Sequence, residues 1–147
     1  MNLVRAFIAA LLLTLASGST ATSPPRIATI IDDLGYRLAA GQRAIELPGS
    51  VSFAVLPGAP RSRDLAHIAF ENGKEVLLHL PLQAEPNDLN QETMGINLDM
   101  SRRELGVIFA KAIAAVPHAI GVNSHRGSLL TRHPGHMEWL MEEIHAY

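Results

Sequence analysis

The stretch IATIIDDLGY, residues 27–36, combines a short apolar run with a pair of aspartates. Apolar and β-branched residues run into Asp32 and Asp33, and Gly35 follows two positions after the pair. A short, nearly continuous apolar run indicates a buried strand, and a glycine just beyond it permits a turn. The sequence therefore predicts a strand over residues 26–32 that ends in two adjacent carboxylates.

Strand-like and helix-like segments alternate from this stretch to residue 147. The further predicted strands are residues 50–57, 75–81 and 119–125, and the predicted helices are residues 36–48, 61–74, 101–117 and 134–147. In the last helix, the spacing places Met137, Leu140, Met141 and Ile144 inward. This β-α-β-α-β-α-β-α order implies parallel strands joined by right-handed helical crossovers, in either an open sheet or a barrel.

The helix predicted over residues 101–117 has the clearest start and end signals. Ser101 and Glu104 have the spacing of a capping box, apolar residues at helical spacing follow, and Pro117 ends the pattern. The sequence therefore predicts the ends of this helix more clearly than those of the other helices.

The N-terminal 21 residues have the pattern of a secretory signal peptide. One positive charge, Arg5, precedes the apolar run AFIAALLLTLA, and small residues ending in Ser19-Thr20-Ala21 follow it. Eleven residues are few for a membrane span, and an uncleaved anchor is the alternative interpretation. We therefore expect an exported protein, periplasmic or secreted, with a signal peptide over residues 1–21, a linker over 22–26 and one domain over 27–147.

The composition excludes several classes of function. Cleavage after Ala21 removes 21 of the 147 residues and leaves 126, a length that suits one domain. Loss of Arg5 leaves 11 Lys and Arg against 14 Asp and Glu, a net charge of −3 that does not favour nucleic acid binding. The chain has no cysteine, so it has no disulfide and any metal must be held by histidine and carboxylate side chains.

Ionisable side chains lie at the ends of three predicted strands. Asp32 and Asp33 end the first, His79 lies near the end of the third, and His125 ends the fourth. Functional groups of parallel sheets and barrels gather where strands end and the following loops begin. A carboxylate with two imidazoles is a common ligand set for Zn²⁺ or a similar transition metal, and it leaves a position open for water.

The doubled aspartate fits hydrolytic chemistry. A metal needs one carboxylate as ligand, and hydrolysis needs a second carboxylate to take the proton of the attacking water. Adjacent residues of a strand point to opposite faces, so both can serve one site only if the chain turns. We expect the loop at Gly35 to supply this turn.

Four motifs carry a family resemblance. IIDDLGY, SFAVLP, EVLLHLPLQ and GVNSHRGSLLT, in this order after an export signal, resemble the divergent branch of the polysaccharide deacetylase family from about Arg26 to the C-terminus. The resemblance implies an α/β fold, a distorted seven-stranded (β/α) barrel, of which this chain supplies the N-terminal part with about four β-α units. It also implies a divalent metal, usually zinc, and removal of N- or O-acetyl groups from sugars such as the N-acetylglucosamine of chitin or peptidoglycan.

The resemblance also implies roles for individual residues. Asp32 would be the catalytic base, and Asp33 and His79 would be metal ligands. The family has a second histidine four residues after the first, where this chain has Gln83, so the second imidazole is assigned to His125 in the segment GVNSHRGS. The general acid of the superfamily, a histidine on a late strand, has no assigned counterpart among the 147 residues.

Other interpretations of the aspartate pair come from unrelated folds. The pair could cap a helix after the strand, or bind Mg²⁺ as in response-regulator receiver domains. Those domains, however, carry an aspartate at the end of the third strand, where this chain has His79.

A second class of function is non-catalytic. Such a protein would keep the deacetylase fold and act as an envelope-binding or scaffold protein. The fourth strand would also leave an unpaired edge, through which the chain could pair with a second copy. The sequence does not distinguish N- from O-acetyl groups or name the sugar.

Several other polar residues have simpler interpretations. We expect Asn123 and Ser124 to form a loop, His67 to be solvated on a helix, and His118 to lie in a turn. The segment HPGH, residues 133–136, resembles a metal clamp in spacing but opens a helix.

Overall fold

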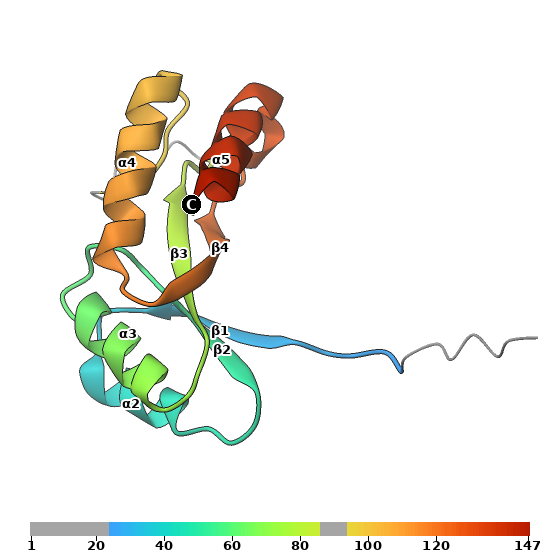
Figure 1. Cartoon of the computed structure of the whole chain (residues 1–147). Helices are drawn as coiled ribbons and strands as arrows, with labels where there is room; N and C mark the ends of the chain where they lie inside the picture. The colour runs from blue at the N-terminus through green and yellow to red at the C-terminus, as the bar shows by residue number, and fades with distance from the viewer. Residues whose placement is uncertain (1–23, 86–93) are drawn as a thin grey trace, which may run out of the picture.

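The computed structural model of the chain describes residues 24–85 and 94–147 (Figure 1). Its strands are β1 (Thr29–Leu34), β2 (Val51–Val55), β3 (Val76–Leu82) and β4 (Ala119–Arg126). Its helices are α2 (Leu38–Ile45), α3 (Ser62–Glu71), α4 (Arg102–Ala115) and α5 (Pro134–Ala146), with a 3-10 turn η1 (Leu130–Arg132). The alternation predicted from the sequence is confirmed, and η1 is an addition to it.

The predicted signal peptide lies outside the described residues. Within residues 24–85 and 94–147, no helix combines the length and the apolar character that a membrane span requires.

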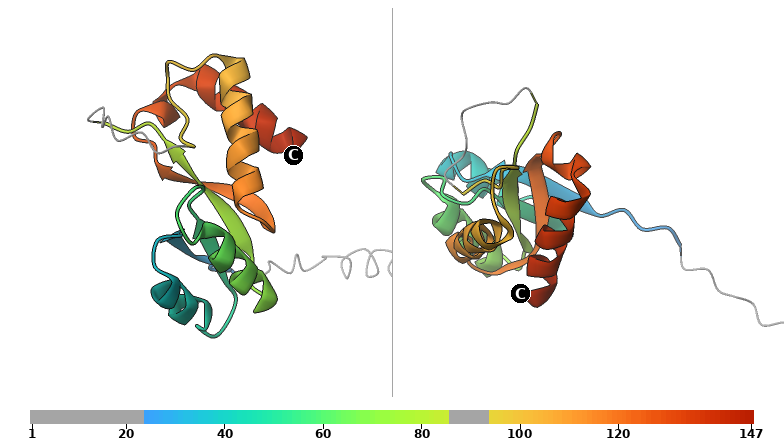
Figure 2. Two further views of the ribbon diagram at one scale, coloured as in Figure 1. Left: turned by 90° about the vertical axis from the view of Figure 1, so that its left-hand side faces the viewer. Right: turned by 90° about the horizontal axis from the view of Figure 1, so that it is seen from above.

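The four strands form one parallel sheet in the order β1-β2-β3-β4. In this order, each connection leads to the next strand on the same side of the previous one. Because such connections are right-handed, they all place their helices on the same face of the sheet. In Figure 2, α4 and α5 accordingly lie on the same side of the strands. A doubly wound sheet would reverse its strand order, so these strands progress as in a (β/α) barrel.

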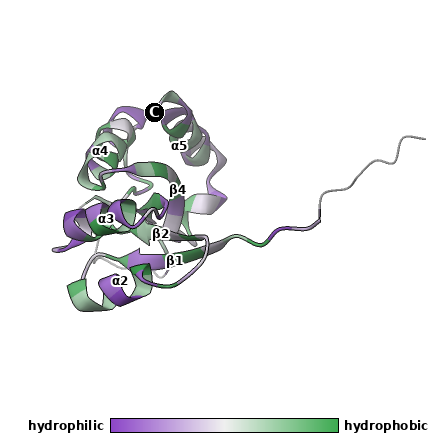
Figure 3. Ribbon diagram, turned by 60° about the horizontal axis from the view of Figure 1, so that its bottom comes forward, coloured by the Kyte–Doolittle hydropathy of each residue, from purple (hydrophilic) through white to green (hydrophobic). Residues whose placement is uncertain are grey.

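The hydrophobic core lies between this face of the sheet and the helices. The strands contribute Val55, Leu78 and Leu80, and the helices contribute Leu65, Leu105, Phe109, Ile113 and Leu140. Alternating hydrophilic and hydrophobic residues along α2 and α3 are visible in Figure 3. One prediction for α5 is wrong: Met141 is 44% exposed, because α5 packs against α4 and η1 with Leu140 as its buried residue.

The capping box predicted for α4 is formed. The Ser101 hydroxyl accepts a hydrogen bond from the Glu104 backbone N–H (3.4 Å), and Glu104 Oε2 accepts from the Ser101 N–H (2.8 Å) and hydroxyl (2.7 Å). The hydrogen bonds from the Ser101 side chain, and then from its backbone, favour the carboxylate form and lower the pKa of Glu104 below its ordinary value of 4.5.

Candidate metal centre

A β-bulge in β1 positions the aspartate pair. The cross-strand pairs on either side of it are Ile31–Phe53 and Leu34–Val55. Asp32 and Asp33 together therefore lie opposite the single residue Ala54, which is the two-against-one pairing of a bulge. Asp33 has a φ of 58°, a left-handed conformation that aspartate tolerates better than most residues. The bulge breaks the alternation of the strand at the point where the two carboxylates occur.

The expected position of the turn needs a correction. The sequence suggested that β1 ends at Asp32 and turns at Gly35, but β1 continues to Leu34 and the backbone turns first at Asp33. Gly35 does have a positive φ of 145°, and a Cβ there would lie 2.7 Å from Ala59 Cβ. Gly35 therefore lets the loop after β2 approach the end of β1.

Three side chains from three strands meet at this end of the sheet. Asp33 Oδ1 lies 3.1 Å from His79 Nε2 and 2.9 Å from His125 Nδ1, and these two ring nitrogens are 3.1 Å apart. Within residues 24–85 and 94–147, they form the one group of three His, Cys, Asp or Glu side chains close enough to share a metal ion. The residues that sequence reasoning assigned as ligands are thus brought together.

The three side chains differ in their access to solvent. The side chain of His79 is 3% exposed, that of His125 19% and that of Asp33 63%. The imidazoles therefore form the floor of the site, and the carboxylate lies at its boundary with solvent.

Asn123 fixes the orientation of His79, a role that sequence reasoning missed. It lies in β4, not in a loop as expected, and its backbone pairs with His79 across β3 and β4. Asn123 Oδ1 lies 2.7 Å from His79 Nδ1. An amide oxygen only accepts, so His79 carries its proton on Nδ1 and directs the lone pair of Nε2 toward Asp33 and His125.

The chemistry of this cluster fits a divalent transition metal. With His79 in this tautomer, the Nε2 lone pair faces the lone pairs of Asp33 Oδ1, an arrangement that needs a shared proton or a cation. Ligand atoms bonded to one metal at about 2.0–2.2 Å lie about 2.8–3.6 Å from one another, the shorter distances corresponding to bond angles near 90°. The observed distances of 2.9–3.1 Å match this spacing, and one carboxylate with two neutral imidazoles suits Zn²⁺ or a similar ion.

Gln83, which stands where the wider family has its second histidine, has a structural role. Its side-chain Oε1 accepts a hydrogen bond from Leu98 N (2.8 Å), and its backbone N–H donates to Ile96 O (3.0 Å). Its carbonyl accepts from Leu129 N and Leu130 N. Gln83 therefore holds two loops together beside β3 and is not one of the three clustered side chains.

Asp32, the expected catalytic base, is exposed next to Asp33. It is not a member of the three-residue cluster, which leaves its carboxylate outside the set of candidate ligands. Ser128, for which the sequence offered no catalytic partners, accepts a hydrogen bond from the Glu85 backbone N–H (2.9 Å) and so has a structural role.

Two known proteins resemble this chain in sequence. The chain is 35% identical over 125 residues to the uncharacterized protein YibQ of Escherichia coli (strain K12), covering 83% of this chain and 38% of that protein. It is 33% identical over 119 residues to an uncharacterized protein of Haemophilus influenzae (strain ATCC 51907 / DSM 11121 / KW20 / Rd), covering 81% and 42%. The chain thus spans about two fifths of the length of these relatives.

A solved structure and a family profile complete the comparison. The crystal structure of an uncharacterized protein from Agrobacterium tumefaciens C58 matches 90% of this chain and 55% of its own chain, with a TM-score of 0.76 and 19% identity, which supports the fold. The profile described as divergent polysaccharide deacetylase matches residues 29–147, from the start of β1 through α5. This chain therefore belongs to the divergent polysaccharide deacetylase family.

Proposed function

We propose that this chain carries the metal site of an exported hydrolase that removes acetyl groups from carbohydrate of the cell envelope. The observation that supports it most strongly is the convergence of Asp33, His79 and His125, whose ligand atoms lie 2.9–3.1 Å apart. The family membership supports the proposed reaction class, and the N-terminal sequence pattern supports the proposed export. Since the chain spans about two fifths of its relatives, the activity of the whole protein belongs to this proposal.

The proposed roles follow from exposure and hydrogen bonding. A bound divalent ion, by preference Zn²⁺, would polarise the acetyl carbonyl and lower the pKa of an attacking water. Asp33, His79 and His125 would hold it, with Asn123 keeping the proton of His79 on Nδ1. Asp32, exposed beside Asp33, would accept the proton of the water. The open, exposed side of Asp33 would admit an acetylated glycan.

Metal content and acetate release test this proposal together. The purified chain is loaded with Zn²⁺, and acetate is measured with acetylated chito-oligosaccharides and with O-acetylated sugars. Asp33→Asn and His125→Ala should lose the bound metal and the activity. Asp32→Asn should keep the metal and lose about 10²–10⁴-fold in rate, the usual contribution of a general base. His145→Ala, an exposed histidine of α5, is the matched control.

Three results would count against the proposal in different ways. A wild-type chain that binds no Zn²⁺ would remove the metal site. An unchanged rate in Asp32→Asn would remove the base. Bound Zn²⁺ without acetate release would favour the alternative, a deacetylase-fold protein that binds the envelope without catalysis.

A further inference from the structure

A second pair of histidines meets on the surface, at a place that the deacetylase site does not use. His67 lies in the middle of α3, and His118 follows Pro117 in the turn between α4 and β4. His67 Nδ1 lies 3.0 Å from His118 Nε2, although the two residues are 51 positions apart. We propose that His67 and His118 form a second metal-binding site, for late first-row divalent cations such as Ni²⁺ and Cu²⁺.

The distance between the two ring nitrogens supports this assignment. Imidazole nitrogens bonded to one metal ion at about 2.0–2.1 Å lie about 3 Å apart when the bonds are near a right angle. The 3.0 Å separation matches that value. Without an ion it is a hydrogen bond between the two rings, and an ion would take the place of the shared proton, which moves to the other nitrogen of the donor ring. Both side chains are exposed, so the ion can enter from solvent and water can complete its coordination.

The surroundings hold the His118 ring in place before any ion arrives. The ring of Phe70, on the next turn of α3, stacks on His118 with centroids 3.9 Å apart and planes within 5° of parallel. The His118 backbone has a φ of 65°, in the left-handed region that few residues other than glycine occupy. A residue held in an uncommon conformation with a fixed ring is typical of a preorganised ligand.

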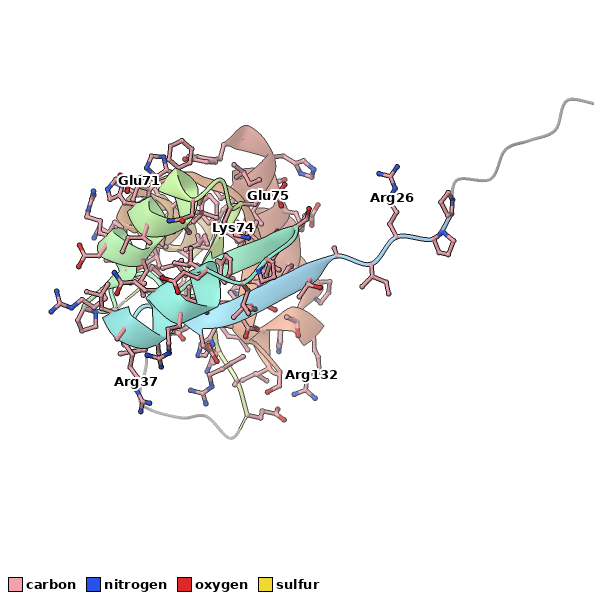
Figure 4. All side chains as sticks on the ribbon, turned by 90° about the horizontal axis from the view of Figure 1, so that it is seen from below. Arg26, Arg37, Glu71, Lys74, Glu75 and Arg132 are labelled. Atoms are coloured by element: carbon pink, nitrogen blue, oxygen red, sulfur yellow. The ribbon has the colours of Figure 1, made fainter. Side chains whose placement is uncertain are left out.

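A contact between α3 and α4 helps to hold His67 beside His118. Arg63, one helical turn before His67, donates a hydrogen bond to Ala114 O of α4 (3.4 Å). The acidic side chains one turn from His67 on α3 are Asp64, paired with Arg61 at 3.4 Å, and Glu71, labelled at the end of α3 in Figure 4. Neither carboxylate completes a three-residue cluster within the described part of the chain.

The ligand set selects the class of cation. Imidazole nitrogen suits Cu²⁺, Ni²⁺ and Zn²⁺, whereas Mg²⁺, Ca²⁺ and Mn²⁺ prefer oxygen ligands. Two imidazoles without a carboxylate therefore bind Ni²⁺ and Cu²⁺ in preference to the oxygen-seeking ions. The site is also independent of Asp33, because His118 lies seven residues before His125, about 23 Å along the strand at 3.3 Å per residue.

Calorimetric titration of the full chain with Ni²⁺ at pH 7.5, without an affinity tag, tests the site. Wild type should bind two equivalents, and the Asp33→Asn/His79→Ala variant should retain one. In that background, His67→Ala or His118→Asn should weaken the retained equivalent at least tenfold. Asparagine is chosen at position 118 because it tolerates the positive φ. Mg²⁺ in excess should not compete, and His145→Ala should change nothing.

A spectroscopic measurement in the same background locates the ion. Ni²⁺ should broaden the ring resonances of His67 and His118 first, and leave those of His133 and His136 sharp. The proposal fails if His67→Ala and His118→Asn, both folded by circular dichroism, keep the Ni²⁺ affinity of the parent. It also fails if His136→Ala is the change that abolishes binding. If the Asp33 centre binds no metal, wild type would still bind the one equivalent that depends on His67 and His118.

Discussion

The Nδ1 atom of His79 lies 2.7 Å from the Oδ1 atom of Asn123, its backbone partner on the neighbouring strand. His79 is buried, so its tautomer is set by its protein neighbours and not by water. The amide of Asn123 therefore keeps the proton on Nδ1 and leaves Nε2, the nitrogen that faces Asp33, with its lone pair. A strand residue outside the three-residue cluster thus sets the chemistry of the candidate metal centre.

Removal of this amide should weaken the centre without unfolding the sheet. We expect Asn123→Ala to lower Zn²⁺ affinity about 10–100-fold, the usual effect of losing the partner of a ligand histidine. Asn123→Asp keeps an acceptor and should keep most of the affinity. Ser124→Ala, at the exposed next residue of β4, is the control. Nitrogen chemical shifts of the metal-free His79 ring should report loss of the Nδ1–H form in Asn123→Ala alone; an unchanged tautomer would contradict this role.

Gly35 should be intolerant of a side chain. A Cβ at Gly35 would lie 2.7 Å from Ala59 Cβ and 3.1 Å from Ser62 Oγ, and the φ of 145° is unfavourable for alanine. We expect Gly35→Ala to lower the free energy of unfolding by about 1–3 kcal/mol. At Gly135 a Cβ meets no atom within 4 Å, so Gly135→Ala in α5 should be neutral or stabilising by up to about 1 kcal/mol. Urea denaturation compares the two, and equal effects would refute the packing argument.

Restoring the family's second histidine at position 83 should not create a better metal site. The Gln83 side chain accepts from Leu98 N, and neither alanine nor histidine reproduces that bond in place. We expect Gln83→His and Gln83→Ala to lose about 1 kcal/mol of stability with Zn²⁺ affinity unchanged. Gln83→Glu, which keeps an acceptor, should lose less. A clear gain of Zn²⁺ affinity in Gln83→His alone would show that this position can reach the centre.

The capping box of α4 should make stability depend on pH in the acid range. Because the folded-state pKa of Glu104 is below its ordinary value of 4.5, its contribution is fully present above pH 4.5 and is lost as pH falls through the lower, folded-state value. The difference in unfolding free energy between wild type and Glu104→Gln should therefore shrink from pH 6 to pH 3. In a Ser101→Ala background the same comparison should show a smaller pH dependence, since the main hydrogen-bond donor is gone. A difference that stays constant with pH would contradict this role.

The outer strand β4 gives a prediction about self-association. Ile120 is 69% exposed on β4, which has a sheet neighbour only on its β3 side among the described residues. We expect copies of this chain to associate through this edge, and Ile120→Lys to shift the population toward monomer. Val107→Lys, at an apolar position of α4 that is 48% exposed, is the matched control. Sedimentation velocity over a concentration series would show a monomer throughout if the edge is not used.

Local sequence signals predicted the order of the elements and much of the centre. Periodicity and turn residues are properties of short segments, so each predicted strand and helix is present with ends shifted by a few residues. Asp33, His79 and His125 could be placed together because parallel strands end at a common edge of a sheet. The family motifs pointed to the same three residues.

Features set by pairing between distant segments could not be predicted. The bulge at Asp33 depends on register with β2, and the His79–Asn123 bond depends on register with β4. The His67–His118 contact joins residues 51 positions apart. Met141 follows the apolar pattern of its helix, but whether a neighbour covers that side of α5 is not a property of the helix itself.

The bulge in β1 makes the aspartate pair more sensitive to deletion than to substitution. A substitution at Asp32 or Asp33 removes one carboxylate and leaves the other where it is. Deletion of either residue would restore the one-to-one pairing with β2 and return the remaining aspartate to the regular alternation of the strand. The site therefore depends on the number of residues in β1 as well as on their identity. Relatives in which β1 is one residue shorter or longer should differ in metal binding.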